Sequence, residues 1–279
     1  MLEEIIANEW AQAAALILTI VTGIYFLWEK IFAGTIWIVN KFKNTFASFF
    51  GKTPTNPFGD KKGRIENPSR FFEQKNLLNE VFGELEKGTS LSLIGGDKTG
   101  KSSLLYHVSE KEPHFFYLDM QNVDDESDFF KALCDGIGIA EIRGYEMFRN
   151  LKKDGKKYVL CIDNIECLTN ELFSGNERTR LRGLAEGADA PLTLLIASRR
   201  SLNELFLDSS NDYSPLYGIC HTIEMPPFSQ KEVHKFIETR LHSTGKQFAE
   251  VDFKTLWQES QGHPARVQEV AKALFEQRC

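Results

Sequence analysis

A glycine-rich loop that ends in lysine and serine is the clearest chemical signal in this chain. The loop comprises Gly95, Gly96, Asp97, Lys98, Thr99, Gly100, Lys101 and Ser102. It satisfies the phosphate-binding pattern G-x-x-x-x-G-K-[ST], with Ser103 next in the chain. Glycines let backbone N–H groups turn toward phosphate oxygens, and the following helix start adds a positive dipole end. We therefore predict that Lys101 contacts the β and γ phosphates of a nucleotide and that Ser102 ligates Mg²⁺. The alternative is a chance glycine-rich turn.

A second candidate is an acidic residue at the end of an apolar run. Residues 158–163 have the sequence YVLCID, which is typical of a buried parallel strand that ends in a carboxylate. Asp163 is therefore the predicted Mg²⁺-associated acid, the Walker B role. The alternative is that Asp163 only caps the next helix. Glu166 is the next acid along the chain and would lie in the first turn of that helix.

A third polar group follows another apolar run, LTLLIA at 192–197. Ser198 comes next, and a polar residue at this strand tip can contact the γ-phosphate or the attacking water. The alternative is an ordinary turn. Several arginines are candidate fingers for a nucleotide, although most are expected to be solvated charges: Arg178, Arg180, Arg182, Arg199 and Arg200.

These candidates need a scaffold in which strand ends converge. Strand-like runs at 90–94, 114–120, 158–163 and 192–197 alternate with helical patterns around 126–135, 143–153 and 177–187. This order predicts an α/β fold, a parallel sheet with helices on both faces and with ligands at the carboxyl ends of the strands. After a strand-like 223–225 and Pro226-Pro227, the pattern becomes helical, which predicts a small all-α lid.

Composition excludes several classes of protein. The chain has 279 residues, 42% apolar and 26% charged, which excludes global disorder. The net charge of −6 argues against nucleic acid as a partner. The five cysteines form no Cys-x-x-Cys pair, so neither a disulfide framework nor a structural zinc site is expected.

The N-terminal region has the character of a membrane anchor. Residues 10–28 carry no charge and are long enough for one transmembrane helix. A signal peptide would need a basic start, whereas Glu3 and Glu4 stand there, and a buried core helix would be shorter. Lysines after the run predict a single-pass protein of the cell inner membrane with its body in the cytoplasm.

The remaining boundaries follow from composition. Residues 31–50 place apolar side chains at helical spacing among lysines, which predicts an amphipathic helix on the inner leaflet. A continuation of the anchor and a self-association helix are the alternatives. We thus predict a membrane segment at 1–50, a turn-rich linker at 51–69, a nucleotide-binding core at 70–222 and the lid at 223–279.

Over residues 56–275 the order of these motifs resembles the AAA+/STAND class of P-loop ATPases, especially bacterial STAND-like and archaeal-type ATPases. The similar motifs are NPFG at 56–59, FFEQK at 71–75, the P-loop, Ser-Arg after the third strand, PFS at 227–229 and GHP at 262–264. The resemblance implies ATP and Mg²⁺ as ligands and places Arg266 at a possible sensor-2 position. It also implies ATP hydrolysis and a homo-oligomer.

Three departures from that class matter. Glu73-Gln74 replaces its Gly-Arg, Asn164 replaces the Glu that usually follows the Walker B acid as the water-activating base, and no repeats follow the lid. The resemblance therefore makes Glu166 the candidate base, and the alternative is an ordinary acid in the first turn of the following helix. Because no repeats follow the lid, a separate sensor or effector protein is an expected partner, and the alternative is that the lid itself is the sensor. The favoured function is a membrane-anchored ATPase switch in signalling or defence. The alternatives are an ATP-binding membrane scaffold with negligible hydrolysis and a membrane-associated motor that remodels DNA or protein.

Overall fold

The computed structural model describes residues 55–278, apart from 60–62, 140–149, 152–154, 156, 170 and 207–214. The predicted transmembrane and amphipathic helices lie outside these residues, as does most of the helical pattern at 143–153. Within the described part of the chain, no helix combines the length and apolar character that a membrane crossing requires.

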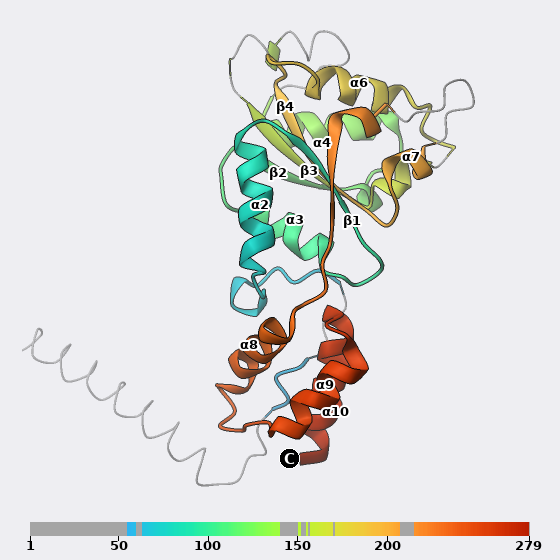
Figure 1. Cartoon of the computed structure of the whole chain (residues 1–279). Coiled ribbons are helices and arrows are strands. Elements are labelled where there is room, and N and C mark those ends of the chain that lie inside the picture. Colours follow the sequence, from blue (N-terminus) through green and yellow to red (C-terminus); the bar gives the residue numbers. More distant parts are fainter. Residues whose placement is uncertain are drawn as a thin grey trace, which may run out of the picture. The chain divides into compact units, whose positions relative to one another are not determined.

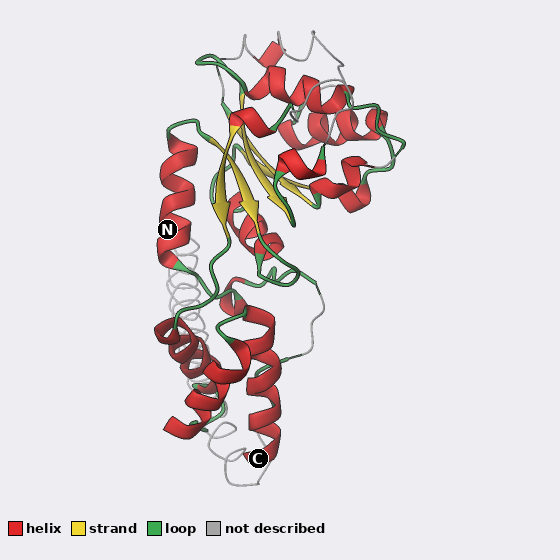
Figure 2. Ribbon diagram, turned by 45° about the vertical axis from the view of Figure 1, so that its right-hand side comes forward, coloured by secondary structure: helices red, strands yellow, loops and turns green. Residues whose placement is uncertain are grey.

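Five parallel strands form one sheet in the order β2-β3-β4-β1-β5. They are β1 (Ser90–Ile94), β2 (Phe115–Asp119), β3 (Tyr158–Asp163), β4 (Leu192–Ser198) and β5 (Cys220–Glu224). The register places Asp119 beside Asp163 and Ile94 beside Ser198. The carboxyl ends of the strands therefore bring the predicted polar groups to one edge, which faces the lid (Figure 2).

Helices cover both faces of the sheet. Successive side chains along a strand point to opposite faces, so each face offers apolar side chains for a helix to pack against. Leu160 and Ile162 pack with α4 (Glu126–Ile137) and α6 (Asn176–Ala185). Val159 and Cys161 pack with α2 (Lys75–Glu86) and α3 (Lys101–Ser109) on the other face (Figure 1). The predicted α/β architecture is thus confirmed. The short α7 (Leu202–Leu205) and four 3₁₀ segments join these elements: η1 (Pro68–Arg70), η2 (Met120–Asn122), η3 (Ile165–Thr169) and η4 (Tyr217–Ile219).

The sheet continues past the predicted core boundary at residue 222. β5 pairs with β1 along its whole length, from Ser90 beside Cys220 to Ile94 beside Glu224. Only Ile223 of β5 is fully buried, because β5 is an edge strand. Pro226-Pro227 then ends the strand, since proline cannot donate a ladder hydrogen bond.

Three helices form the C-terminal part: α8 (Gln230–Leu241), α9 (Glu250–Ser260) and α10 (Pro264–Arg278). Ser229 starts α8 with a capping box, in which its side chain and that of Glu232 satisfy each other's backbone N–H groups. The three helices share a separate apolar cluster, which includes Phe236, Leu256 and Val267. This part is the predicted all-α lid.

Residues 56–72, which we call the arm, contact both the lid and the sheet domain. Phe58 is buried in the apolar cluster of the lid, and the Asn56 amide donates to the carbonyl of Lys272, at 3.2 Å. Farther along, the Ile65 N–H donates to the Ser103 hydroxyl at 2.9 Å, while His107 donates to the Ile65 carbonyl at 2.8 Å. Two described stretches of the predicted linker, 56–59 and 64–65, are therefore packed against the protein.

Candidate nucleotide-binding site

The P-loop joins β1 to α3 and has an unusual backbone. Lys98 and Gly100 adopt φ values of 58° and 102°, a left-handed conformation that costs a residue with a Cβ about 1–3 kcal/mol. Gly100 avoids that cost, whereas Lys98 bears it. A Cβ on Gly95 would lie 3.0 Å from Met225 and from Thr99. The loop is thus held close to the strand ends in a shape suited to backbone contact with an anion.

Lys101 curls over this loop. Its Nζ donates to the carbonyls of Gly95 and Gly96 at 2.6 and 2.8 Å. Burial lowers the pKa of Lys101, and the negative charges of Glu166 and Asp163 partly offset this effect. The ammonium group is held by neutral carbonyls, so it is available to turn toward a phosphate.

Asp163 ends β3 and is only 3% exposed. Its Oδ2 accepts a 2.6 Å hydrogen bond from the Tyr117 hydroxyl, and its Oδ1 accepts from the Asn164 N–H at 3.0 Å. A carboxylate has about four acceptor sites, so capacity remains for a metal-bound water. Burial, followed by the hydrogen bond to Asp163, raises the pKa of Tyr117, which keeps the phenol protonated as a donor.

Asn164 forms the turn that follows β3, which its position after Asp163 in the sequence did not predict. Its φ is 54°, a left-handed conformation that Asn tolerates better than most residues. Its amide donates to Asp119 Oδ1 at 2.9 Å. Asn164 therefore turns the chain from β3 into η3, the segment that carries Glu166.

Glu166 and Ser198 lie at the tip of β4, beside the P-loop. The backbone N–H of Arg199 donates to Glu166 Oε1, and the Gly95 N–H donates to the Ser198 carbonyl at 3.2 Å. The Ser198 hydroxyl is buried and has no hydrogen-bond partner among the described residues. An unpaired buried hydroxyl is costly in a folded protein, so this group is a candidate for contact with a ligand.

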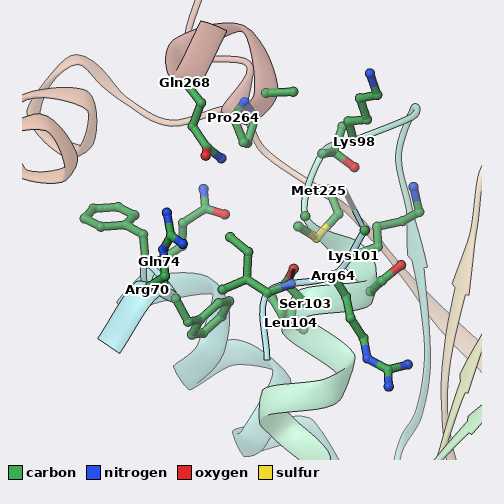
Figure 3. A pocket seen from close by; sticks show the side chains of 18 of the residues that line it. Arg64, Arg70, Gln74, Lys98, Lys101, Ser103, Leu104, Met225, Pro264 and Gln268 are labelled. Atoms are coloured by element: carbon green, nitrogen blue, oxygen red, sulfur yellow. Dashed lines mark hydrogen bonds between the residues drawn. The ribbon is translucent and has the colours of Figure 1, made fainter. Parts of the chain in front are cut away.

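A cavity of about 960 Å³ opens between the P-loop, the arm and the lid, a size in the usual range for small-molecule sites. Figure 3 shows side chains around it, with Gln74 and Arg70 at the left, Arg64 and Lys101 at the right, and Pro264 and Gln268 of the lid above. The predicted residues among its lining are Lys98, Thr99, Gly100, Lys101, Ser102, Ser103 and Asp163.

Other predicted residues lie outside that lining. Gly95, Gly96, Asp97, Glu166 and Ser198 are not part of it. Asp97 instead pairs with Arg199 at 2.8 Å, and its carbonyl contacts His263 Nε2 at 3.2 Å. Asp97 thereby links the P-loop both to the β4 tip and to the lid.

Two arginines of the prediction have other partners. Arg266 also lies outside the lining and pairs with Glu269 at 3.3 Å on the surface of α10. Arg178 is buried, where it donates to the Leu168 carbonyl and pairs with Glu177, both at 3.0 Å. A buried arginine with these contacts cannot act as a finger on another subunit.

The sequence did not identify Tyr117, Arg64 or Gln74 as site residues. All three line the cavity, and the Gln74 amide donates to the Pro226 carbonyl at 3.2 Å, which ties α2 to the start of the lid. A polar residue two positions before the end of β2 was a weak signal for Tyr117. Arg64 belongs to a stretch with no pattern of its own, whereas Gln74 lies in the FFEQK motif at 71–75, which was a signal for that residue.

The residues fit a Mg²⁺–nucleotide complex. Ser102 and Asp163 line the same cavity as Lys101, and the P-loop has the backbone shape described above. No group of three or more His, Cys, Asp or Glu side chains suited to a metal occurs within the described residues. Mg²⁺ usually needs only one or two protein groups, with phosphates and waters completing its ligands.

Several solved proteins have a similar fold, among them a Walker-type ATPase. A Walker-type ATPase of Pyrococcus abyssi shares 14% identity over 80% of this chain and 72% of its own, with a TM-score of 0.61. A RuvB mutant of Thermotoga maritima shares 17% identity over 76% of this chain, with a TM-score of 0.51. The ORC2 protein of Aeropyrum pernix, in ADPNP and ADP complexes, shares 14% identity over 79% of this chain, also with a TM-score of 0.51.

The chain spans 65% of the length of the RuvB and ORC2 chains. No protein-family model matches the sequence. No curated protein matches it either. At these identities the likeness establishes the fold alone.

Proposed function

We propose that this protein is an ATPase that binds ATP·Mg²⁺ between the P-loop and the lid. The observation that carries the proposal is the convergence of Lys101, Ser102 and Asp163 on one cavity beneath the lid. Bound Mg²⁺ would be held by Ser102 and the nucleotide, with Asp163 as the adjacent acid, and would neutralise charge on the phosphates. Lys101 would exchange its two loop carbonyls for phosphate oxygens.

Glu166 is the proposed base for the attacking water. Its Oε1 is engaged by the Arg199 N–H, which fixes the carboxylate beside the β4 tip. From there it would orient a water and accept its proton, while the unpaired Ser198 hydroxyl would contact the γ-phosphate. A general base of this kind contributes typically 10²- to 10⁴-fold to a rate.

The test uses a fragment that begins at Thr53, since residues 56–278 form one compact unit. Lys101→Ala should weaken ATP binding by about 10- to 100-fold, because a charged hydrogen bond to phosphate is lost. Glu166→Gln should leave binding unchanged and lower turnover at least about 100-fold. Glu171→Gln, an exposed acid beyond η3, is the matched control. Nucleotide binding that survives Lys101→Ala unchanged would contradict the proposed site.

A scaffold that binds ATP without turnover is the second candidate. Asn164 favours it, because this residue stands where a base is expected and its amide is committed to Asp119. ATP binding with no measurable turnover in the wild-type fragment would decide for the scaffold. Turnover that disappears in Glu166→Gln would decide against it.

We also propose that the ATPase is tethered to the inner membrane through residues 10–28, with the body in the cytoplasm, and that ATP binding promotes self-association. A separate sensor or effector protein would then read its state. The uncharged run and the lysines that follow it support this proposal. Full-length protein in detergent should form a larger species with ATP than without it. One size under both conditions would contradict the switch.

A further inference from the structure

A phenol on β2 fixes the predicted Mg²⁺-associated acid. The Tyr117 hydroxyl donates to Asp163 Oδ2 at 2.6 Å, a short bond of the kind made to an ionised oxygen. The Asn164 N–H holds the other carboxylate oxygen. Asp163 is thus held at both oxygens, and of these two hydrogen bonds between described residues, the one from Tyr117 comes from another strand.

The Tyr117 ring is itself held by the arm. The guanidinium carbon of Arg64 lies 4.6 Å from the centre of the Tyr117 ring and 4.9 Å from that of Tyr106. The two rings meet edge to face at 5.9 Å. Arg64 also lies 3.8 Å from Asp119, which neighbours Asp163 in the sheet. Arg64 and Tyr117 line the same cavity as Lys101. Figure 3 labels Arg64 and Lys101 there.

We propose that Tyr117 is a positioning residue for Mg²⁺ through Asp163, and that Arg64 of the arm holds the Tyr117 ring in place. This inference rests on the proposed ATP·Mg²⁺ site. Hydrogen bonds that orient a metal-associated group strengthen metal binding, and their loss typically costs 10- to 100-fold in metal affinity. Stacking of an arginine on the ring adds a smaller contribution. Docking of the arm thereby sets how tightly the site holds Mg²⁺.

The test measures Mg²⁺ binding apart from catalysis. Full-length protein is saturated with a fluorescent, non-hydrolysable ATP analogue, and Mg²⁺ is titrated from zero. Tyr117→Phe should raise the half-saturating Mg²⁺ concentration about tenfold, while affinity for the analogue in EDTA stays unchanged. Tyr106→Phe is the matched control, since it removes a hydroxyl from the adjacent ring that does not contact Asp163 and should change nothing.

Two further variants separate positioning from general damage. In an Asp163→Asn background, Tyr117→Phe should have no additional effect, because its action passes through that carboxylate. Arg64→Gln should raise the half-saturating Mg²⁺ concentration about threefold.

An unchanged or lower Mg²⁺ requirement in Tyr117→Phe would overturn the proposal, and a lower one would show that the phenol competes with the metal. An unchanged requirement in Arg64→Gln would overturn the role of the arm. Failure of the wild-type protein to bind the analogue at all would instead refute the proposed function.

Discussion

The packing of Phe58, a residue of the arm, into the lid gives the sharpest test of the fold. Residues 51–69 are rich in turn-forming types, yet Phe58 is 2% exposed within the lid. Its ring centre lies 6.0 Å from that of Phe248 and 6.4 Å from those of Phe236 and Phe275. Phe58→Ala removes a ring enclosed by three others, while the contacts of Asn56, Arg70 and Phe72 with the lid remain.

The expected loss of stability follows from that burial. Replacement of a buried Phe by Ala costs about 3–5 kcal/mol, because transfer free energy is lost and a cavity remains. The slope of unfolding in urea is about 1–3 kcal/mol per M for small proteins. The urea midpoint of the lid should therefore fall by roughly 2 M.

The assay is urea unfolding followed by fluorescence of Trp257, which packs against the apolar cluster of the lid. The other tryptophans, at positions 10, 28 and 37, are replaced by Phe in all proteins compared. Val251→Ala is the matched control, because this lid residue is 60% exposed, and its effect should stay within about 0.5 kcal/mol. If Phe58→Ala shifts the midpoint no more than Val251→Ala, the arm does not pack into the lid as described.

Three further outcomes are expected. Gly262 has φ 76°, and a Cβ there would lie 2.0 Å from the Phe228 carbonyl oxygen. Gly262→Ala should therefore lower the free energy of unfolding in urea by about 2 kcal/mol or more. An effect below about 0.5 kcal/mol would contradict this prediction. Burial lowers the pKa of His107 from its ordinary 6.5, so the unfolded chain binds more protons and stability should fall as pH drops below 6.5. Unfolding midpoints across that range should fall less in His107→Gln, and equal slopes would refute the assignment. Ser198→Ala and Ser92→Ala each remove a buried hydroxyl with no partner among the described residues, so neither should lower the unfolding midpoint. Only Ser198→Ala should reduce ATP turnover, and equal turnover in both would remove Ser198 from the site.

Local sequence predicted the glycine-rich loop and the strands around it well. The P-loop, the apolar run that ends at Asp163 and the strand that ends at Ser198 are each contiguous, so their residue types and spacing are sufficient signals. Strand alternation with helices also predicted a parallel sheet, since few topologies satisfy that order. By contrast, the sequence pattern of β5 was a weaker signal, because this edge strand buries few side chains and lacks a continuous apolar run.

The residues that contact those elements could not be predicted in this way, because they come from distant parts of the sequence. No spacing rule connects Tyr117 to Asp163, which are 46 residues apart, because strand order in the sheet decides which side chains meet. The same holds for Arg64 above the Tyr117 ring and for Phe58 within the lid.

The sequence by itself therefore determined the type of fold and the glycine-rich loop, because both depend on short contiguous patterns of glycine, charge and apolar periodicity. The tertiary structure decided which polar groups share the cavity. In it, Arg266 pairs with Glu269, Arg178 is buried, and Asn164 adopts a left-handed turn conformation. These outcomes depend on packing and on the pairing of distant backbones, which local residue patterns do not encode.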